Sequence, residues 1–405
     1  MNNWFEEHID FATLGIILLL LMIGVASVYS ATYDAGASIY FHRQLLWAGL
    51  GLLIMLIIMM IPLRTLQLLS YPLYGLSIVV LLFVLAAGKV VAGSKSWFGI
   101  GGLGLQPSEI VKVTTILALA SFLSDPQANL RRMKTIVITF AIVLLPVALI
   151  LLQPDTGTAI VYLCTLPFIL YWAGASNFLM IALLAPVAAA VATLSGTTAF
   201  VIVLLIMVLF LFLLRENWFA RALVFSATVL VGVSVQFAYG KLKPYQQKRI
   251  LTFLNPDADP LGAGYNVIQS KIAIGSGGLF GKGYLQGSQT QLNFLPAQWT
   301  DFIYCVPGEE FGFLGAFLIL SLLILLMWRG VSLASSVKSR YASIVAIGLV
   351  GTFAVHTAIN IGMAMGMMPV IGVPLPFMSY GGSNLLTNMI MGGLLLNMYA
   401  NRKEY

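Results

Sequence analysis

The chain has 405 residues, of which 60% are hydrophobic and 9% are charged. Soluble domains carry about 25% charged residues, so this composition excludes an ordinary soluble protein, a disordered chain and a fibrous one. The net charge is +7, but the sequence has no clustered basic face of the kind that binds nucleic acid, and we expect no nucleic-acid partner.

Twelve apolar runs of membrane-spanning length follow one another along the chain. They lie near 11–30, 44–61, 71–88, 106–124, 135–152, 157–173, 178–194, 198–214, 222–239, 308–328, 341–362 and 382–400. About 20 apolar residues in a helix cross the hydrocarbon, and the lack of water there requires such segments to be helical. The sequence therefore predicts an all-α, polytopic membrane protein with about twelve spans, folded as a single domain over residues 1–405.

Basic residues of the short loops predict the orientation. They follow the second, fourth, eighth, tenth and last runs, at Arg64, Arg131, Arg132, Lys134, Arg215, Arg221, Arg329, Lys338, Arg340, Arg402 and Lys403. All of them lie on one side if the N-terminus is cytoplasmic, as the positive-inside rule requires. We expect both termini in the cytoplasm and a large extracytoplasmic loop at 240–307, before the tenth run.

The 240–307 loop is the predicted catalytic segment. It is far longer than the usual connection, which is typical of a functional or disordered segment, and its many Leu, Ile and Phe residues argue against disorder. Tyr265–Ile274 is a candidate for a short re-entrant or interfacial helix. Gly275–Gly283 departs from the phosphate-loop pattern at Ser276 and Gly283, so we expect a flexible turn network there and no nucleotide cofactor.

Asp301 lies at the end of this loop, just before an apolar run. Two interpretations stay open. The carboxylate either favours the dipole of a following helix, or lies in a partly apolar cleft with a pKa suited to general-base catalysis. Glu309 and Glu310 are better helix-start residues, which weakens the first interpretation.

Further ionisable groups lie within or against the apolar runs. Glu109 and Lys112 are spaced i, i+3 on one helix face, either as a self-sufficient ion pair or as groups that face a pocket. Asp155 either caps a helix or faces the same pocket. His356 is expected to be a hydrogen-bonded packing residue.

Two outer positions complete the candidate site. Arg43 begins the second run, and Trp97 is either an interfacial anchor or a stacking surface for a sugar ring. Together these residues indicate an outward-facing cavity with a carboxylate at its mouth. Its cations suit a pyrophosphate, and its apolar wall suits a polyprenyl tail.

Six blocks of sequence resemble a known family in their order along the chain. They are GSKSWFGIGG, QPSEIVK, QPDTGTA, NPDADPLGAGYNVIQSKIAIGSGGLFGKG, FLPAQWTDFIY and IGVPLPFMSYGGSNLL. They are similar to the SEDS family (shape, elongation, division and sporulation; RodA, FtsW and SpoVE), and two blocks look closer to its RodA branch. Relatives typically have ten spans, so the resemblance implies a ten-span core with an added hydrophobic pair within 178–239.

The resemblance implies a peptidoglycan glycosyltransferase of the bacterial cytoplasmic membrane. Such an enzyme polymerises lipid II into β-1,4 glycan strands during cell elongation, with its active site on the outer face. A lipid II flippase and a non-catalytic scaffold of the cell-wall machinery remain as alternatives. The implied partners are a class B penicillin-binding protein transpeptidase, the elongation complex and membrane lipid.

The resemblance also implies roles for residues. The family's essential aspartate matches Asp301, and its cavity residues match Glu109, Lys112, Asp155 and Trp97. Lys112, Lys271 and Arg43 are candidates to stabilise the leaving pyrophosphate, alone or with a divalent cation, Mg or Mn. Glu109 and Asp155 would orient these cations or hold the metal ion. Many relatives have His or another polar residue where this chain has Trp299.

Overall fold

The structure, a computed structural model, describes residues 9–34, 36, 38–91, 94–100, 103–214, 216–241, 264–292 and 294–403. All twelve predicted apolar runs are helices. Their bounds are α2 Phe11–Tyr33, α3 Ser38–Met59, α4 Leu63–Ala87, α5 Pro107–Ser124, α6 Met133–Leu151, α7 Thr156–Trp172, α8 Asn177–Ser195, α9 Thr197–Leu213, α10 Trp218–Lys241, α15 Gly312–Ser336, α16 Arg340–Ala364 and α17 Gly382–Ala400. In the described residues, nine of these are long and apolar enough to cross a membrane, and α7 and α9 are shorter apolar helices. The prediction of a polytopic helical membrane protein is confirmed.

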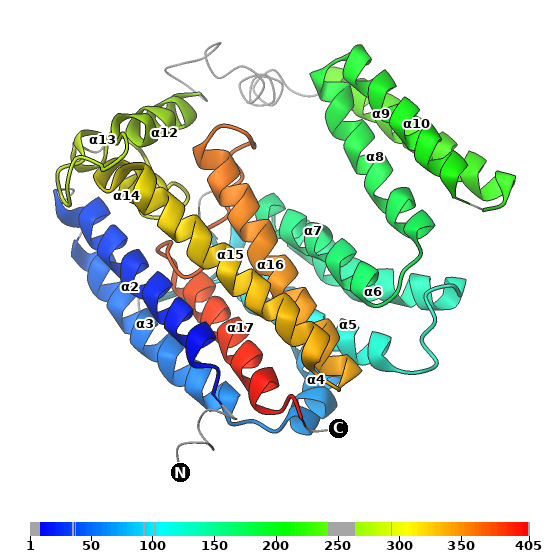
Figure 1. The fold of residues 1–405 in the computed structure, drawn as a ribbon, viewed down its shortest axis with the longest axis horizontal. Helices are drawn as coiled ribbons and strands as arrows, with labels where there is room; N and C mark the ends of the chain where they lie inside the picture. Colours follow the sequence, from blue (N-terminus) through cyan, green and yellow to red (C-terminus); the bar gives the residue numbers. More distant parts are fainter. Residues whose placement is uncertain are drawn as a thin grey trace. The chain divides into compact units, whose positions relative to one another are not determined.

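Contacts between helices group the chain into two units. The first contains α2–α7 and α15–α17. Within it α16 packs against α5 and α15, α17 packs against α3 and α5, and α2 packs against α3 and α15 (Figure 1). Most residues of α5, α16 and α17 are buried, so these helices form the core.

Small residues allow the core helices to approach closely. A Cβ at Gly348 of α16 would lie 2.5 Å from the side chain of Ile116 of α5, and one at Gly393 of α17 would lie 2.8 Å from the carbonyl oxygen of Met55. Helices in a membrane gain little from hydrophobic exclusion, so close packing of small residues supplies much of their association.

The second unit contains α8, α9 and α10, which pack on one another. Its core is the apolar cluster of Met207, Leu211 and Val224. It carries the hydrophobic pair that the sequence predicts in addition to the family's ten spans.

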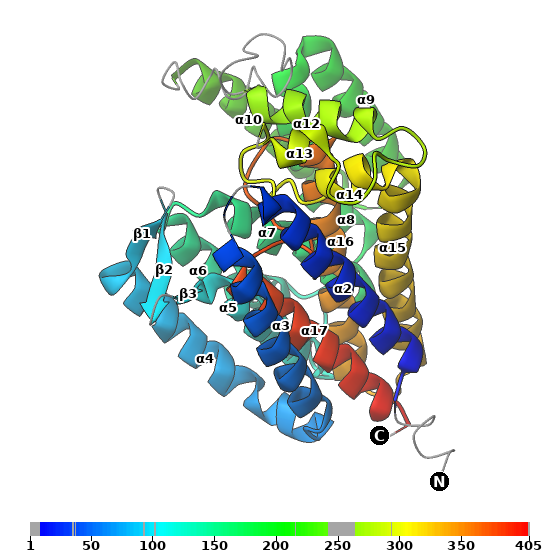
Figure 2. The same ribbon diagram turned by 90° about the vertical axis from the view of Figure 1, so that its left-hand side faces the viewer.

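A three-stranded antiparallel sheet lies between α4 and α5 in the chain. Its strands are β1 Lys89–Val91, β2 Ser94–Ile100 and β3 Leu103–Leu105, and β2 packs on α4 (Figure 2). The sequence analysis placed an outer loop here and missed the strands. Two of the strands have three residues each, which is too few for an alternating pattern to show.

Three short helices follow within the predicted catalytic loop: α12 Tyr265–Ser276, α13 Ser288–Gln291 and α14 Cys305–Glu310. The predicted helix at Tyr265–Ile274 is confirmed as α12. Residues 242–263 of the loop lie outside the described residues.

The glycine-rich turn after α12 packs directly on the end of α14. A Cβ at Gly281, where φ is +80°, would lie 2.0 Å from the carbonyl oxygen of Glu310. The amides of Lys282 and Gly283 donate to the carbonyls of Glu309 and Glu310, at 3.1 and 2.9 Å. The predicted turn network is confirmed, and its glycines allow two backbones to touch.

Candidate active site

Asp301 lies in a turn four residues before α14, and the two residues before it share its surroundings. Ser379 Oγ donates to the carbonyl of Thr300 (2.7 Å), and the amide of Tyr380 donates to the carbonyl of Trp299 (2.8 Å). Asn360 Nδ2 donates to the carbonyl of Asp301 itself (2.9 Å). The 299–301 turn is therefore held by α16 and by the 371–380 loop, which joins α16 to α17.

The carboxyl group of Asp301 is mostly buried and has few donors. A Cβ built on Gly372 would lie 3.7 Å from Asp301 Oδ2, so the 371–380 loop forms a wall beside the carboxylate. Burial raises the pKa of Asp301 above its ordinary value, and the hydrogen bond with the Thr300 side chain opposes this increase. A carboxylate in this setting is more basic than one in water, which suits proton acceptance.

The helix-dipole interpretation of Asp301 loses its basis, because α14 begins only at Cys305. The expectation that Glu309 and Glu310 start a helix is wrong. Both lie at the end of α14 and are buried, and their carboxylates bind the outer turns. Local charge suggested helix starts, but Gly312, at φ +64°, breaks the helix after them.

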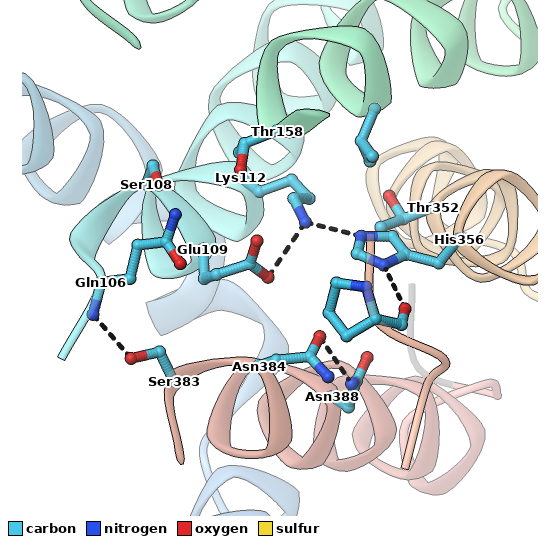
Figure 3. A network of polar contacts seen from close by, with 12 residues as sticks. Gln106, Ser108, Glu109, Lys112, Thr158, Thr352, His356, Ser383, Asn384 and Asn388 are labelled. Carbon is cyan, nitrogen blue, oxygen red and sulfur yellow. Dashed lines mark hydrogen bonds and ion pairs between the residues drawn. The ribbon is translucent and has the colours of Figure 1, made fainter. Parts of the chain in front are cut away.

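A buried polar network occupies the start of α5 (Figure 3). Lys112 Nζ donates to Glu109 Oε2 (3.2 Å) and to His356 Nε2 (2.8 Å), and His356 Nδ1 lies 3.0 Å from the carbonyl oxygen of Pro374. Because a carbonyl only accepts, Nδ1 carries the hydrogen and Nε2 accepts from the ammonium group. The predicted ion pair and the hydrogen-bonded role of His356 are both confirmed.

Asp155 caps α7 and also holds the start of α5. Its Oδ1 accepts from the amide of Thr158 (3.2 Å), and its Oδ2 accepts from Gln106 Nε2 (2.7 Å) and Ser108 Oγ (3.4 Å). The amide of Gln106 donates in turn to Ser383 Oγ of α17 (2.6 Å; Figure 3). The cap interpretation is confirmed, and the same carboxylate fixes α5 relative to α7.

The 371–380 loop connects this network to Asp301. The carbonyl of Pro374 binds His356, the carbonyl of Val373 accepts from Asn360 (2.8 Å), and Gly372 lies beside Asp301. Three successive residues of the loop thus reach the buried network, α16 and the proposed base.

Aromatic rings flank the 299–301 turn. Tyr40 of α3 stacks on Trp299, with ring centroids 5.2 Å apart, and meets the edge of Tyr380 at 5.1 Å. Arg43 hydrogen-bonds with the Tyr380 side chain, a neutral partner. Arg43 therefore contacts Tyr380, and Tyr380 in turn contacts the 299–301 turn that carries Asp301.

Two predicted site residues stand apart. Lys271 of α12 lies over Gly366 at the end of α16, and Trp97 of β2 covers Gly104 of β3. Among the described residues, no hydrogen bond or ion pair joins either of them to Asp301. The described part of the chain also contains no group of three or more His, Cys, Asp or Glu residues able to hold a metal ion.

A shallow, widely open apolar groove with a volume of about 480 Å³ runs along α2 and α3. Its lining is aliphatic except for aromatic rings from Tyr29, Phe41 and Tyr284. Phe41 and Arg43 both lie in the first turns of α3.

Sequence reasoning missed Asn360, Gln106 and Ser379. Asn360 is a polar residue inside an apolar run, and the rule that singled out His356 would have found it. Gln106 and Ser379 lie in the blocks QPSEIVK and IGVPLPFMSYGGSNLL, but neither side chain is ionisable, so a search for charged groups passes over them.

Comparison with known proteins places this arrangement in a family. A family model for FtsW, RodA and SpoVE, described as "Cell cycle protein", matches residues 8–200 and 177–404. "Peptidoglycan glycosyltransferase RodA" of Treponema pallidum is 36% identical, over 97% of this chain and 98% of that protein. "Peptidoglycan glycosyltransferase MrdB" of Escherichia coli K12 is 34% identical, over 99% and 96%.

Solved structures agree. A chain in "Structural coordination of polymerization and crosslinking by a peptidoglycan synthase complex" is similar with a TM-score of 0.76 and 29% identity, over 98% of this chain and 99% of that one. The crystal structure of Thermus thermophilus rod shape determining protein RodA has a TM-score of 0.65 and 26% identity, with 98% of each chain covered. The chain therefore belongs to the FtsW/RodA/SpoVE family of cell cycle proteins, as its sequence blocks predicted.

Proposed function

We propose that this protein is a peptidoglycan glycosyltransferase that polymerises lipid II into β-1,4 glycan strands during cell elongation. The observation that carries the proposal is Asp301, a mostly buried carboxylate with a raised pKa, held between α16 and the 371–380 loop. The names of the relatives that match nearly the full chain support the same activity.

The reaction requires one base and one site for a leaving anion. The 4-hydroxyl of GlcNAc on an acceptor lipid II attacks the anomeric carbon of the donor MurNAc, and Asp301 accepts the hydroxyl proton. The new bond joins O4 to C1, while the bond from C1 to the pyrophosphate oxygen breaks. Its electron pair leaves with undecaprenyl pyrophosphate, and attack from the opposite face converts the α-linked donor into a β-linked product.

Arg43 is the cation best placed to stabilise the leaving pyrophosphate. The charge of Lys112 is balanced by Glu109 in a buried pair, whereas the contact of Arg43 with Tyr380 involves no opposite charge. A prenyl chain in the groove of α2 and α3 brings its pyrophosphate toward the first turns of α3, where Arg43 lies. Glu109 and Asp155, the carboxylates expected to hold a metal ion, bind Lys112 and the start of α5 and α7 instead, so a divalent cation would be held by the pyrophosphate oxygens together with water.

The bundle has two distinct ends, which supports the expected orientation. At one end Arg329 pairs with Asp10 (2.6 Å), and Asn397 binds the carbonyls of Ile58, Met59 and Ile61. The opposite end carries the 299–301 turn and the 371–380 loop. We place the first end and both termini in the cytoplasm, and the end with Asp301 on the outer face of the cytoplasmic membrane.

A class B penicillin-binding protein remains the proposed partner. The support is that a similar chain belongs to a peptidoglycan synthase complex described as coordinating polymerization and crosslinking. A glycan made by this protein would then be cross-linked by that partner.

The test is polymerisation of lipid II by the purified chain, with and without Mg²⁺, Mn²⁺ and the partner. Asp301→Asn is expected to fold and to form no glycan, because an amide cannot accept the proton. Asp10→Asn, at the other end of the bundle, is the matched control and keeps its activity. Full activity of Asp301→Asn would remove Asp301 from the chemistry. Movement of fluorescent lipid without glycan formation would favour the flippase.

A further inference from the structure

Asn360 is a fully buried amide near the end of α16, on the same helix face as His356. Its Nδ2 donates two hydrogen bonds, to the carbonyl of Asp301 at 2.9 Å and to the carbonyl of Val373 at 2.8 Å. The two acceptors belong to the 299–301 turn and the 371–380 loop. A single side chain therefore ties together the two segments that form the proposed catalytic centre.

The orientation of this amide is set by its partners. Both acceptors are carbonyl oxygens, so the side-chain nitrogen has to face them and uses both of its hydrogens. Its Oδ1 is buried and accepts no hydrogen bond from the described residues. A buried polar atom without a partner costs about 1–3 kcal/mol, so stability alone gives little reason for an asparagine here.

The two bonds set the surroundings of the Asp301 carboxylate. One fixes the backbone of Asp301. The other fixes Val373. The neighbouring residue, Gly372, lies beside the carboxylate, and a Cβ built on it would be 3.7 Å from Asp301 Oδ2. His356, one helical turn before Asn360, binds the next carbonyl of the loop, that of Pro374. The wall is thus held at two successive carbonyls from one face of α16.

We propose that Asn360 is a positioning residue for Asp301, which locks the 299–301 turn against Gly372 so that the carboxylate stays buried and directed at the acceptor hydroxyl. This inference rests on the proposed glycosyltransferase function. Positioning of this kind matters because an error of about 1 Å in a reacting group can reduce a rate about 100-fold.

The variant that tests the proposal is Asn360→Leu, which keeps the volume and removes both donors. Asn360→Ser, with at most one donor, serves if the leucine variant does not fold. The matched control is Asn397→Leu. Asn397 is also a fully buried asparagine that clamps backbone carbonyls, those of Ile58, Met59 and Ile61, but it does so at the other end of the bundle.

Three measurements are made on the purified full-length variants, each normalised to the folded fraction. We expect Asn360→Leu to lower kcat for lipid II polymerisation about 100-fold, with KM changed less than about threefold. In a plot of kcat against pH, the fall on the acid side (the acid limb) moves to lower pH, because the carboxylate of Asp301 is then exposed to water. Among the described residues, the Thr300 hydroxyl and Gly372 lie beside the Asp301 carboxylate and the Asn360 amide binds its backbone carbonyl, and none of these groups titrates. Amide hydrogen exchange in peptides that cover 299–303 becomes faster.

Asn397→Leu is expected to lose a similar amount of thermal stability. Its kcat, the pH dependence of kcat and the amide hydrogen exchange at 299–303 are expected to match those of the wild type. The proposal is overturned if Asn360→Leu matches this control in kcat and in the acid limb. If the wild-type chain forms no glycan, the proposed function fails, and hydrogen exchange alone then decides whether Asn360 holds the turn.

Discussion

Asp301 combines burial with a shortage of hydrogen-bond donors to its carboxylate, and this combination sets its basicity. Burial disfavours the charged form, and only the Thr300 side chain opposes that effect among the causes that shift its pKa. The folded state therefore binds a proton at Asp301 more tightly than the unfolded chain does. At pH values above the raised pKa, the buried charge of Asp301 lowers the free energy of unfolding. Asp301→Asn removes this charge and is therefore expected to be at least as heat-stable as the wild type at neutral pH.

The same shift predicts the pH dependence of the reaction. A general base works only when deprotonated, so kcat falls as the pH drops through the raised pKa, with a midpoint above the ordinary aspartate value of 3.8. Thr300→Val removes the side-chain hydrogen bond that lowers this pKa, and we expect the acid side of the kcat profile to move to higher pH. A pH profile of kcat checks both statements, and a limb that moves to lower pH in Thr300→Val would contradict them.

The two candidate cations, Arg43 and Lys112, are expected to behave differently when neutralised. Lys112→Gln leaves Glu109 buried without its partner, which costs on the order of 3–5 kcal/mol, and Glu109→Gln in the same chain restores most of the stability. Arg43→Gln breaks no ion pair with the residues that the structure describes, and it is expected to keep the melting temperature while kcat falls by about 10²-fold. Thermal unfolding and single-turnover polymerisation separate the two effects. An Arg43→Gln enzyme with normal kcat would exclude Arg43 from stabilising the leaving group.

Among the secondary-structure elements, the six-residue helix α14 holds the turns at 282–290 through its last two carboxylates. Glu309 Oε1 accepts from Lys282 Nζ (2.7 Å) and from the amide of Gln289 (2.9 Å), and its Oε2 accepts from the amide of Thr290 (3.0 Å). Glu310 accepts from the Ser30 hydroxyl of α2 and from the amide of Leu285. These bonds fix the segment that leads to the 299–301 turn.

Glu309→Gln is expected to loosen this segment and to destabilise the fold by about 2 kcal/mol or more, since charge-assisted bonds are lost at a buried position. Burial opposes ionisation of Glu309, but the Gln289 amide, the Lys282 ammonium and the Thr290 amide outweigh it and lower its pKa below the ordinary 4.5. A lowered carboxyl pKa gives stability that is present above pH 4.5 and is lost as the pH falls through the folded pKa. Melting temperatures across this range should converge for wild type and Glu309→Gln at acid pH, and parallel curves would contradict the assignment.

For the whole molecule, all the site residues named here lie in the unit of α2–α7 and α12–α17, and none lies in α8, α9 or α10. We predict that α8 and α9 are the added pair of spans, and an even number of added crossings leaves the sidedness of later helices unchanged. We therefore expect deletion of 177–217 to preserve both the orientation of α15 and lipid II polymerisation.

Cysteine labelling from the outer face and the polymerisation assay check this deletion. Deletion of 197–217, which removes only α9, is the control and is expected to invert α15 and abolish activity. An inactive but correctly oriented 177–217 deletion would show that α8 and α9 contribute to the reaction.

The sequence alone determined the membrane-spanning helices, because about 20 apolar residues in a row have one stable form in a bilayer. It also identified the local pairs whose partners are three residues apart, such as Glu109 with Lys112 and Asp155 with the start of α7, and six ordered blocks that indicated the family. Only the tertiary structure showed that Gly372 stands beside Asp301, that Asn360 ties the turn to the 371–380 loop, and that Arg43 reaches that loop through Tyr380. Those contacts join segments far apart in the chain, and their geometry depends on how α3, α16 and α17 pack, which no local pattern of residues encodes.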